Sequence, residues 1–251
     1  MKPVSIIIPV YNGASFVTQA LDCASQQAPA NSEIIVIDDG SSDGSADIAR
    51  AHRADPHVIS QSNQGPGAAR NRGIEIASRS YVAFLDVDDL WPEGKLQRQM
   101  KLLEKSPELD LVLGLIQHQV LPGGTHFDMQ FEDEEASTLP FFHFGAGLYR
   151  RRCFEAVGLI DEALSDSEDH DWFIRFKEAG LNWVVESVIG LIYRRHTTNM
   201  TQPAPLNKTE IFRVLALSLA RRRSGSACDD VAPLEKLTDR RMTDSGKERT
   251  K

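Results

Sequence analysis

Three carboxylates lie within four positions at Asp86, Asp88 and Asp89, directly after the apolar residues 81–85. Carboxylates this close repel one another, so such a cluster is kept where something positive neutralises it. A hard divalent cation, Mg²⁺ or Mn²⁺, takes oxygen ligands and can bridge carboxylates to a substrate diphosphate. The cluster therefore predicts a metal site for phosphate chemistry. A solvated acidic turn that caps the next helix would have the same composition and stays open as an alternative.

A second acidic segment, DDGSSDGS at residues 38–45, also follows an apolar run. Its glycines let the backbone turn sharply, and Ser42 or Ser45 can cap a following helix. Capping does not explain the adjacent pair Asp38 and Asp39. A carboxylate at this position can accept hydrogen bonds from a nucleobase N–H or a ribose hydroxyl.

The glycine-rich segment NQGPGAARNRG at residues 63–73 begins like a dinucleotide fingerprint. Arg70 stands where the third glycine of that fingerprint should be, and the preceding strand is not the first of the sheet. These departures exclude a dehydrogenase. Arg70 and Arg72 can reach a phosphate or an acidic partner, and surface solvation explains Arg72 at least as well.

Two further polar segments are less specific. In SEDHDW, at residues 167–172, several ionisable groups precede an apolar helix face. The helix dipole favours such an acidic N-terminus, so a structural and a catalytic role both stay open. His196 closes the segment YRRH at the end of an apolar run, and a lone histidine is more often structural than a ligand.

The elements that must position these residues alternate along the chain. Apolar and β-branched runs predict strands, and helical spacing predicts helices between them. The expected strands are residues 4–10, 33–37, 58–61, 81–85, 109–120 and 183–193, and the expected helices are 14–26, 46–52, 66–78, 95–105, 148–157, 170–179 and 211–223. This order predicts an α/β fold with a mostly parallel sheet and helices on both faces. Ligands bind beyond the carboxyl ends of such strands, so both acidic clusters are expected on one rim.

The second half is less regular. A hairpin turn is expected at residues 122–124, and the acidic residues 127–139 are expected to form a mobile loop. The last helix carries Phe212, Leu215 and Leu219 on one face. Packing of this face on the core is the preferred interpretation. Three arginines at its end leave a membrane-surface anchor as the alternative.

Bulk composition excludes several classes. The 251 residues suit one large α/β domain or two fused halves, and a net charge of -8 argues against nucleic-acid binding. Three cysteines without zinc spacing indicate reduced thiols in a cytoplasmic protein. No signal peptide and no transmembrane helix are predicted. We expect a cytoplasmic protein, with peripheral association at the inner face of the membrane left open.

Taken together and in this order, six segments resemble glycosyltransferase family 2. They are VSIIIPVYNG, IDDGSSDGS, NQGPGAARNRGI, FLDVDDLW, SEDHDW and YRRHTTNM, within residues 3–201. The resemblance implies the GT-A fold, in which a Rossmann-like nucleotide-binding half is fused to an acceptor-binding half. The implied divisions are 1–95 for the nucleotide-sugar half and 96–200 for the acceptor and catalytic-base half. Beyond them, helical spacing predicts an amphipathic helix in 201–223, and the polar, charged composition of 224–251 predicts a disordered tail.

The resemblance also implies residue roles. Asp169 matches the general base. Arg70 and Asn71 match a motif whose contacts vary among members; we assign Arg70 to the nucleotide. The remaining matches are Pro9, Val10 and Tyr11 in the nucleobase pocket, Asp39 on the base, Asp86 near the ribose, Asp88 on the metal, and His196 near the metal or diphosphate.

The implied activity is single-displacement transfer with inversion at the anomeric carbon. The expected donor is a nucleotide-diphosphate sugar, with a UDP-sugar preferred, and the expected acceptor is a glycan or lipid-linked hydroxyl. Mg²⁺ or Mn²⁺ is the expected cofactor, and a crowded acidic site with bound diphosphate is expected to raise the pKa of Asp169. A nucleotidyltransferase is disfavoured because the N-terminus lacks a basic glycine-rich phosphate loop. A non-catalytic sugar-nucleotide-binding protein remains the second alternative.

Overall fold

The computed structural model describes residues 1–124, 138–139, 142–164, 167–199 and 208–225. Its centre is an eight-stranded sheet in the order β3-β2-β1-β4-β7-β5-β6, with β8 paired to β5. All pairs are parallel except β4–β7, β5–β7 and β5–β6, which confirms the mostly parallel sheet. The strands are β1 (Val4–Val10), β2 (Glu33–Asp38), β3 (His57–Ser60), β4 (Tyr81–Phe84), β5 (Leu111–Val120), β6 (Thr138–Leu139), β7 (Gly147–Arg150) and β8 (Trp183–Arg195).

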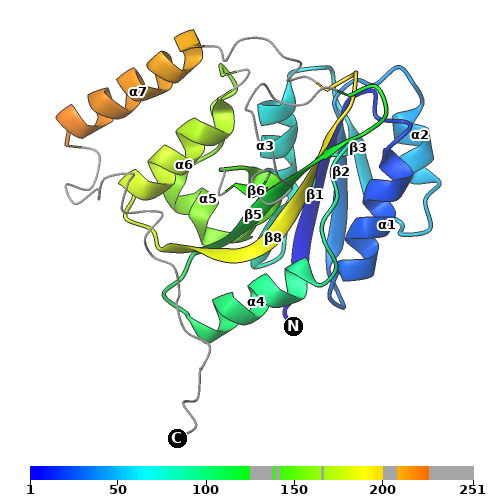
Figure 1. Cartoon of the computed structure of the whole chain (residues 1–251), viewed down its shortest axis with the longest axis horizontal. Helices are drawn as coiled ribbons and strands as arrows, with labels where there is room; N and C mark the ends of the chain where they lie inside the picture. The colour runs from blue at the N-terminus through cyan, green and yellow to red at the C-terminus, as the bar shows by residue number, and fades with distance from the viewer. Residues whose placement is uncertain (125–137, 140–141, 165–166, 200–207, 226–251) are drawn as a thin grey trace, which may run out of the picture.

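Helices cover both faces of the sheet (Figure 1). In that view α3, α5 and α6 lie on one side, α1, α2 and α4 lie on the other, and α7 lies outermost beyond α6. The helices are α1 (Val17–Gln27), α2 (Ser45–Arg50), α3 (Pro66–Ile76), α4 (Lys95–Lys105), α5 (Arg152–Val157), α6 (Glu168–Glu178) and α7 (Lys208–Arg223). Strands from both predicted halves join in one sheet, and the division at residue 95 stays a prediction.

Close packing of α3 on β1 depends on Gly73. A Cβ atom at this position would lie 2.4 Å from Ile7 Cγ2, which is far inside van der Waals contact. Ile7 is fully buried in β1, so the strand cannot yield. The glycine therefore lets α3 approach the sheet and brings Arg70, one turn earlier, over its rim.

The prediction of a helix over residues 148–157 is wrong for the first half of that range. The structure has strand β7 there, and the helix begins only at α5. Leu148 and Tyr149 are fully buried, and Tyr149 pairs with Val82 on one side and Leu111 on the other. Pairing with two distant strands therefore decides the local conformation, and no local pattern records it.

The turn at residues 122–124 is confirmed by a backbone hydrogen bond from Gly124 to Leu121 (2.9 Å) and by a left-handed Gly123. The loop expected over residues 127–139 is wrong at its end, because Thr138–Leu139 form β6 on β5. Residues 127–137 of that loop, and the expected tail from residue 226 onward, lie outside the described residues.

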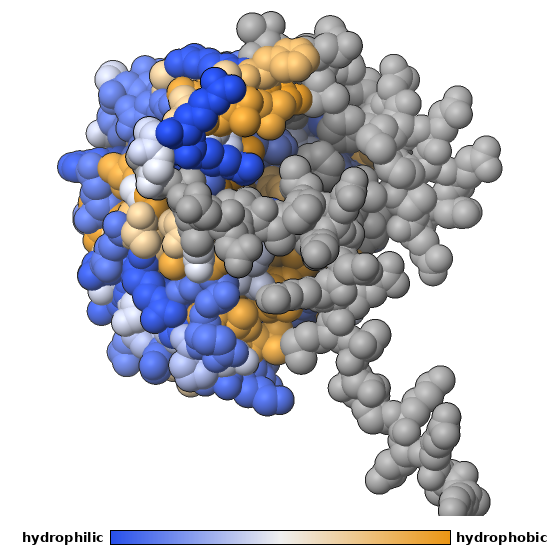
Figure 2. Space-filling model, turned by 90° about the vertical axis from the view of Figure 1, so that its left-hand side faces the viewer, coloured by the Kyte–Doolittle hydropathy of each residue, from blue (hydrophilic) through white to orange (hydrophobic). Residues whose placement is uncertain are grey.

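The expected packing of α7 is also wrong. Phe212, Leu215 and Leu219 are 69%, 45% and 53% exposed, whereas Val214 and Ser218 on the opposite face are buried. Figure 2 views the side on which α7 lies and shows apolar surface beside strongly hydrophilic surface at the top. The helix packs on α6 through polar contacts, described below. Among the described helices, none combines the length and hydrophobicity needed to cross a bilayer.

Two cysteines fall in the described ranges, Cys23 and Cys153, and both are free thiols. Burial raises the pKa of Cys153 to about 12, so its reactive thiolate form is scarce at neutral pH. This agrees with the expected structural role of the thiols.

Lys95, at the start of α4, is fully buried. Its Nζ donates to Gly147 O at 2.7 Å and lies 4.4 Å from the centre of the Trp91 ring. Burial nevertheless lowers the pKa of Lys95 to about 7 from its ordinary 10.5. Between these values the unfolded chain holds a proton that the folded chain lacks, so raising the pH favours folding.

We therefore expect the unfolding free energy of the wild type, relative to Lys95→Met, to rise by on the order of 2–4 kcal/mol between about pH 7 and pH 10. Urea unfolding of both proteins across this range measures the difference and cancels other titrating groups. If the unfolding free energies of the two proteins change in parallel with pH, Lys95 stays charged in the folded state.

Candidate functional site

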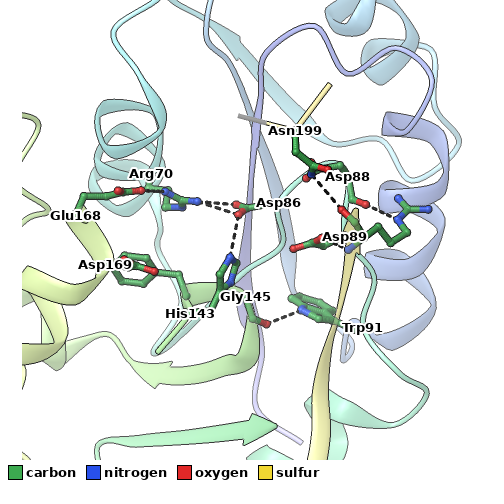
Figure 3. A network of polar contacts seen from close by, with 12 residues as sticks. Arg70, Asp86, Asp88, Asp89, Trp91, His143, Gly145, Glu168, Asp169 and Asn199 are labelled. Carbon is green, nitrogen blue, oxygen red and sulfur yellow. Dashed lines mark hydrogen bonds and ion pairs between the residues drawn. The ribbon is translucent and has the colours of Figure 1, made fainter. Parts of the chain in front are cut away.

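The acidic residues meet at the carboxyl end of the sheet (Figure 3). Asp86 and Asp89 lie in the turn after β4, which is closed by a hydrogen bond from Asp89 N to Asp86 O (3.0 Å). Leu90 then pairs with Ile192 of β8 through two backbone hydrogen bonds of 3.1 and 2.8 Å. This bridge brings the end of β8 against the acidic turn, so segments about a hundred positions apart form one site.

Arg70 is the central cation of the site. Its Nη2 lies 2.9 Å from both carboxylate oxygens of Asp86, and its Nη1 lies 2.9 Å from Glu168 Oε1. The guanidinium also lies 5.6 Å from the centre of the Phe144 ring. Arg70 is buried, so its charge is committed to two acids. The sequence left a phosphate or an acidic residue as the partner of Arg70, and the structure shows two acidic residues.

Asp88 is held by the turn that follows β8. Its Oδ2 lies 3.1 Å from His196 Nε2 and 3.2 Å from Asn199 Nδ2, and its carbonyl accepts from the Arg194 side chain. Burial first, and then repulsion from Asp86, raises the pKa of Asp88, while His196 opposes the rise. The structure thus joins the two residues that the sequence assigned to the metal, Asp88 and His196.

A second set of ligand atoms lies beside this pair. One atom from each of Asp86, Asp89 and His143 lies within 4.8 Å of the other two. Asp89 is 1% exposed; its Oδ1 accepts from Arg194 N (2.9 Å), while its Oδ2 has no hydrogen-bond partner among the described residues. Burial, together with Asp88 and Asp86, raises the pKa of Asp89 well above its usual value. An unpartnered buried carboxylate oxygen among acids and a histidine suits a divalent cation.

Sequence reasoning missed His143 and Asn199. His143 Nε2 lies 3.7 Å from Asp86 Oδ2, and its ring packs edge-on against Tyr193 at 5.7 Å. The only local signal is a histidine among aromatic and glycine residues before β7, which carries no metal spacing. Asn199 lies inside the quoted segment YRRHTTNM, but nothing in its type singled it out.

Asp169 lies in the first turn of α6, beside the buried Glu168. Its side chain is 18% exposed, and its Oδ1 lies 2.9 Å from His170 Nδ1. Burial acts to raise the pKa of Asp169, but the hydrogen bond from His170 and the charges of His143 and Arg70 bring it below its usual value. Positive neighbours thus outweigh burial, and the rise in the pKa of Asp169 expected with bound diphosphate stays a prediction.

Asp39 and the segment after β1 form the far side of the rim. Asp39 is buried; its Oδ1 accepts from Gln61 Nε2 and Gln64 N, both at 2.9 Å, and its Oδ2 accepts from Gly65 N at 2.8 Å. The carboxylate thus holds the loop before α3. Of the three residues expected around a nucleobase, Tyr11 is 51% exposed, Pro9 is half-buried and Val10 is buried.

Asn71 and Arg72, the two residues that follow Arg70, make structural contacts. Asn71 Nδ2 donates to Ile160 O (2.9 Å) and its Oδ1 accepts from Ile160 N (2.8 Å), which fixes the segment after α5. Arg72 is exposed and pairs with Glu75 one turn away at 3.2 Å. Surface solvation is therefore the correct interpretation of Arg72.

The chain resembles known proteins in sequence and in fold. The family model described as "Glycosyl transferase family 2" matches residues 5–158. An uncharacterized glycosyltransferase of Rickettsia prowazekii, RP339, is 32% identical over 210 residues, which are 78% of this chain and 66% of that protein. The chain thus spans about two thirds of that relative's length.

Two solved structures have the same fold. S. aureus TarS 1–349 in complex with UDP-GlcNAc superposes with a TM-score of 0.68 at 20% identity, over 87% of this chain and 66% of TarS 1–349. The mannosyltransferase PcManGT of Pyrobaculum calidifontis, in complex with GDP-Man and Mn²⁺, gives 0.62 at 20% identity, over 94% of this chain and 67% of that one. The expected GT-A fold is confirmed. With more than half of its residues matched by the family model, the chain belongs to glycosyl transferase family 2.

Proposed function

We propose that this chain transfers a sugar from a nucleotide-diphosphate sugar to an acceptor hydroxyl, with inversion at the anomeric carbon. The observation that carries the proposal is one rim on which Arg70 bridges Asp86, after β4, to Glu168 of α6, the neighbour of Asp169 (Figure 3). Two proteins of the same fold were solved with UDP-GlcNAc and with GDP-Man and Mn²⁺. Their ligands support a nucleotide sugar as donor, and we propose a UDP-sugar.

The base in this proposal is Asp169. A carboxylate with a lowered pKa is ionised at neutral pH, and its 18% exposure leaves it accessible to an acceptor. Asp169 accepts the hydroxyl proton while the oxygen attacks the anomeric carbon. Attack in one step, opposite the departing diphosphate, inverts the configuration.

Arg70 organises both sides of the reaction. It binds Asp86, which we assign to the ribose, and Glu168, the neighbour of the base. Because removing one partner of a buried ion pair leaves a buried charge uncompensated, the three side chains hold one another in place. Arg70 therefore acts by positioning these two acids.

A divalent cation fits the acidic turn. Asp88 with His196, or Asp86, Asp89 and His143, would hold Mg²⁺ or Mn²⁺, and the unpartnered Asp89 Oδ2 supports the fit. When bound, such an ion supplies positive charge that stabilises the departing diphosphate. Tyr11, Pro9, Val10 and Asp39 are proposed to hold the nucleobase.

For the acceptor we propose the hydroxyl of a glycan or lipid-linked saccharide, on the strength of the family resemblance. We also propose that the reaction takes place in the cytoplasm, where thiols are kept reduced. Both cysteines in the described ranges are free thiols, as expected in a reducing compartment.

A panel of UDP-glucose, UDP-galactose, UDP-GlcNAc and GDP-mannose tests the donor. We expect at least one to raise the melting temperature by several degrees with Mn²⁺ present, because ligand at about 100 times Kd adds about 2.7 kcal/mol. The same nucleotide sugar should be hydrolysed slowly without acceptor. Binding without hydrolysis or transfer to any saccharide would favour the non-catalytic alternative, and no stabilisation by any donor would remove the proposal.

A further inference from the structure

The outer face of α7 is an apolar stripe in contact with solvent. We call Phe212, Leu215 and Leu219, together with Arg223, the α7 face. The three apolar residues are spaced three and four positions apart, so they share one side of the helix. Their exposures of 69%, 45% and 53% place most of this apolar surface in water. Ala216 and Ala220, also exposed, lie on the same side and add no polar group.

The opposite side of α7 is fixed to the body of the protein. Arg221 donates to Glu178 Oε2 (2.6 Å) and to Asp171 Oδ1 (3.2 Å), and Ser218 donates to Glu178 Oε1. Val214 is buried on the same side. Polar bonds to two buried acids thus select which side of α7 faces inward, and they leave the apolar stripe outward.

Positive charge borders the stripe. Arg223 follows Leu219 by four positions and is exposed, and Arg213 and Arg222 are exposed on its flanks. Among the described side chains of α7 the only acid is Glu210, at the other end. The α7 face is therefore apolar and cationic within a chain whose net charge is -8.

This composition favours a lipid surface over a second copy of the chain. The exposed area of the three apolar residues is roughly 300 Å², while a stable protein interface needs about 800 Å² from each partner. A bilayer needs no matching surface: the apolar side chains enter the acyl boundary, and arginines bind anionic headgroups. Charge complementarity and limited area therefore point to the same occupant.

We propose that the α7 face docks in the plane of an anionic lipid bilayer. Because Arg221 bonds α7 to Asp171, two positions after Asp169, docking fixes the helix that carries the proposed base relative to the membrane. An acceptor hydroxyl on a lipid headgroup would then be presented near α6. Docking itself rests on the surface of α7 and does not depend on the donor or the reaction.

Vesicle sedimentation with the full chain tests the proposal. We expect binding to vesicles of equal phosphatidylcholine and phosphatidylglycerol, and at least tenfold weaker binding to phosphatidylcholine alone. Binding to the anionic vesicles should weaken as salt rises, because headgroup charges are screened. Absence of binding to the anionic vesicles at low salt would overturn the proposal.

Two variants separate the apolar and charged parts. The triple variant Phe212→Ser, Leu215→Ser, Leu219→Ser should bind anionic vesicles at least tenfold more weakly. Its matched control changes three exposed apolar residues elsewhere, Ile48→Ser, Leu159→Ser and Val188→Ser, and should bind like the wild type.

Arg223→Glu should weaken binding by about tenfold, since reversing one charge removes and opposes headgroup attraction. Lys101→Glu, on the exposed side of α4, is its matched control and should have no such effect. Melting temperatures check that every variant is folded. Wild-type binding by the folded triple variant would overturn the proposal. So would a concentration-dependent dimer that the triple variant alone abolishes, because the α7 face would then be an interface between copies.

Discussion

Replacing Asp169 with asparagine is expected to slow sugar transfer by about 100-fold or more, the usual range for loss of a general base. Asparagine keeps the shape of the side chain but cannot accept the proton. Affinity for the donor and the metal should stay near that of the wild type, because Arg70 binds Asp86 and Glu168 and not Asp169. Transfer rates and calorimetric titration of nucleotide with Mn²⁺ measure the two effects separately.

The pH dependence follows from the neighbours of Asp169. Burial alone would raise its pKa, but the bond with His170 lowers it below the usual value, so the carboxylate is ionised at neutral pH. A base of this kind loses activity only as the pH falls through its lowered pKa. The acidic limb of the rate profile should therefore lie in the acid range and shift upward in His170→Ala, which removes the imidazole that lies 2.9 Å from Asp169 Oδ1 and keeps the backbone N–H that donates to the same oxygen.

Two neighbouring acids serve as controls for Asp169. Glu168→Gln and Asp171→Asn should reduce transfer less, because Glu168 binds Arg70 and Asp171 is buried between Arg175 (2.7 Å) and Arg221 (3.2 Å). Melting temperatures distinguish lost stability from lost catalysis in these variants. Near wild-type transfer by Asp169→Asn, with a large loss in folded Asp171→Asn, would move the base to the other carboxylate.

Most of the fold was predictable because each strand is an apolar run of consecutive residues and helical spacing marks the helices between them. Residues 4–10 form β1 as expected, and residues 95–105 form α4 with the expected ends. The failures share one cause, which is that contacts with distant segments decide the outcome. Tyr149 lies in a strand because it pairs with β4 on one side and β5 on the other. The inward side of α7 is the one that carries Arg221 and Ser218, because both side chains bind a buried acid of α6.

The site was predictable where chemistry is written in adjacent residues. Neighbouring carboxylates repel one another and need a positive partner, and this local argument identified the turn that carries Asp86 and Asp88. His143 could not be found in this way, since only the fold brings it within 3.7 Å of Asp86. Arg70 was assigned to the nucleotide, but its ion pairs with two acids are visible only once α3, β4 and α6 are assembled.

Replacing Asp88 with alanine is expected to lower the Mn²⁺-dependent affinity for nucleoside diphosphate by about 100-fold. Loss of a residue that only supports a metal ligand costs about 10-fold to 100-fold, and loss of the ligand itself should cost at least as much. His196 and Asn199 both contact Asp88 Oδ2, and such support is typical of carboxylates that bind metals. Affinity without metal should change little, because Arg70 contacts Asp86 and not Asp88. Titration of UDP or GDP, whichever the donor screen selects, measures both affinities.

The competing set of Asp86, Asp89 and His143 makes this prediction decisive. If Asp88 binds the ion, His143→Gln should retain most of the metal-dependent affinity, and His196→Ala should lose about 10-fold to 100-fold through the freed carboxylate. Should Asp88→Ala keep its affinity while His143→Gln and Asp89→Asn lose theirs, the ion lies on the other three residues. The unpartnered Asp89 Oδ2 would then be a direct ligand, and Asp88 would serve to anchor the turn after β8.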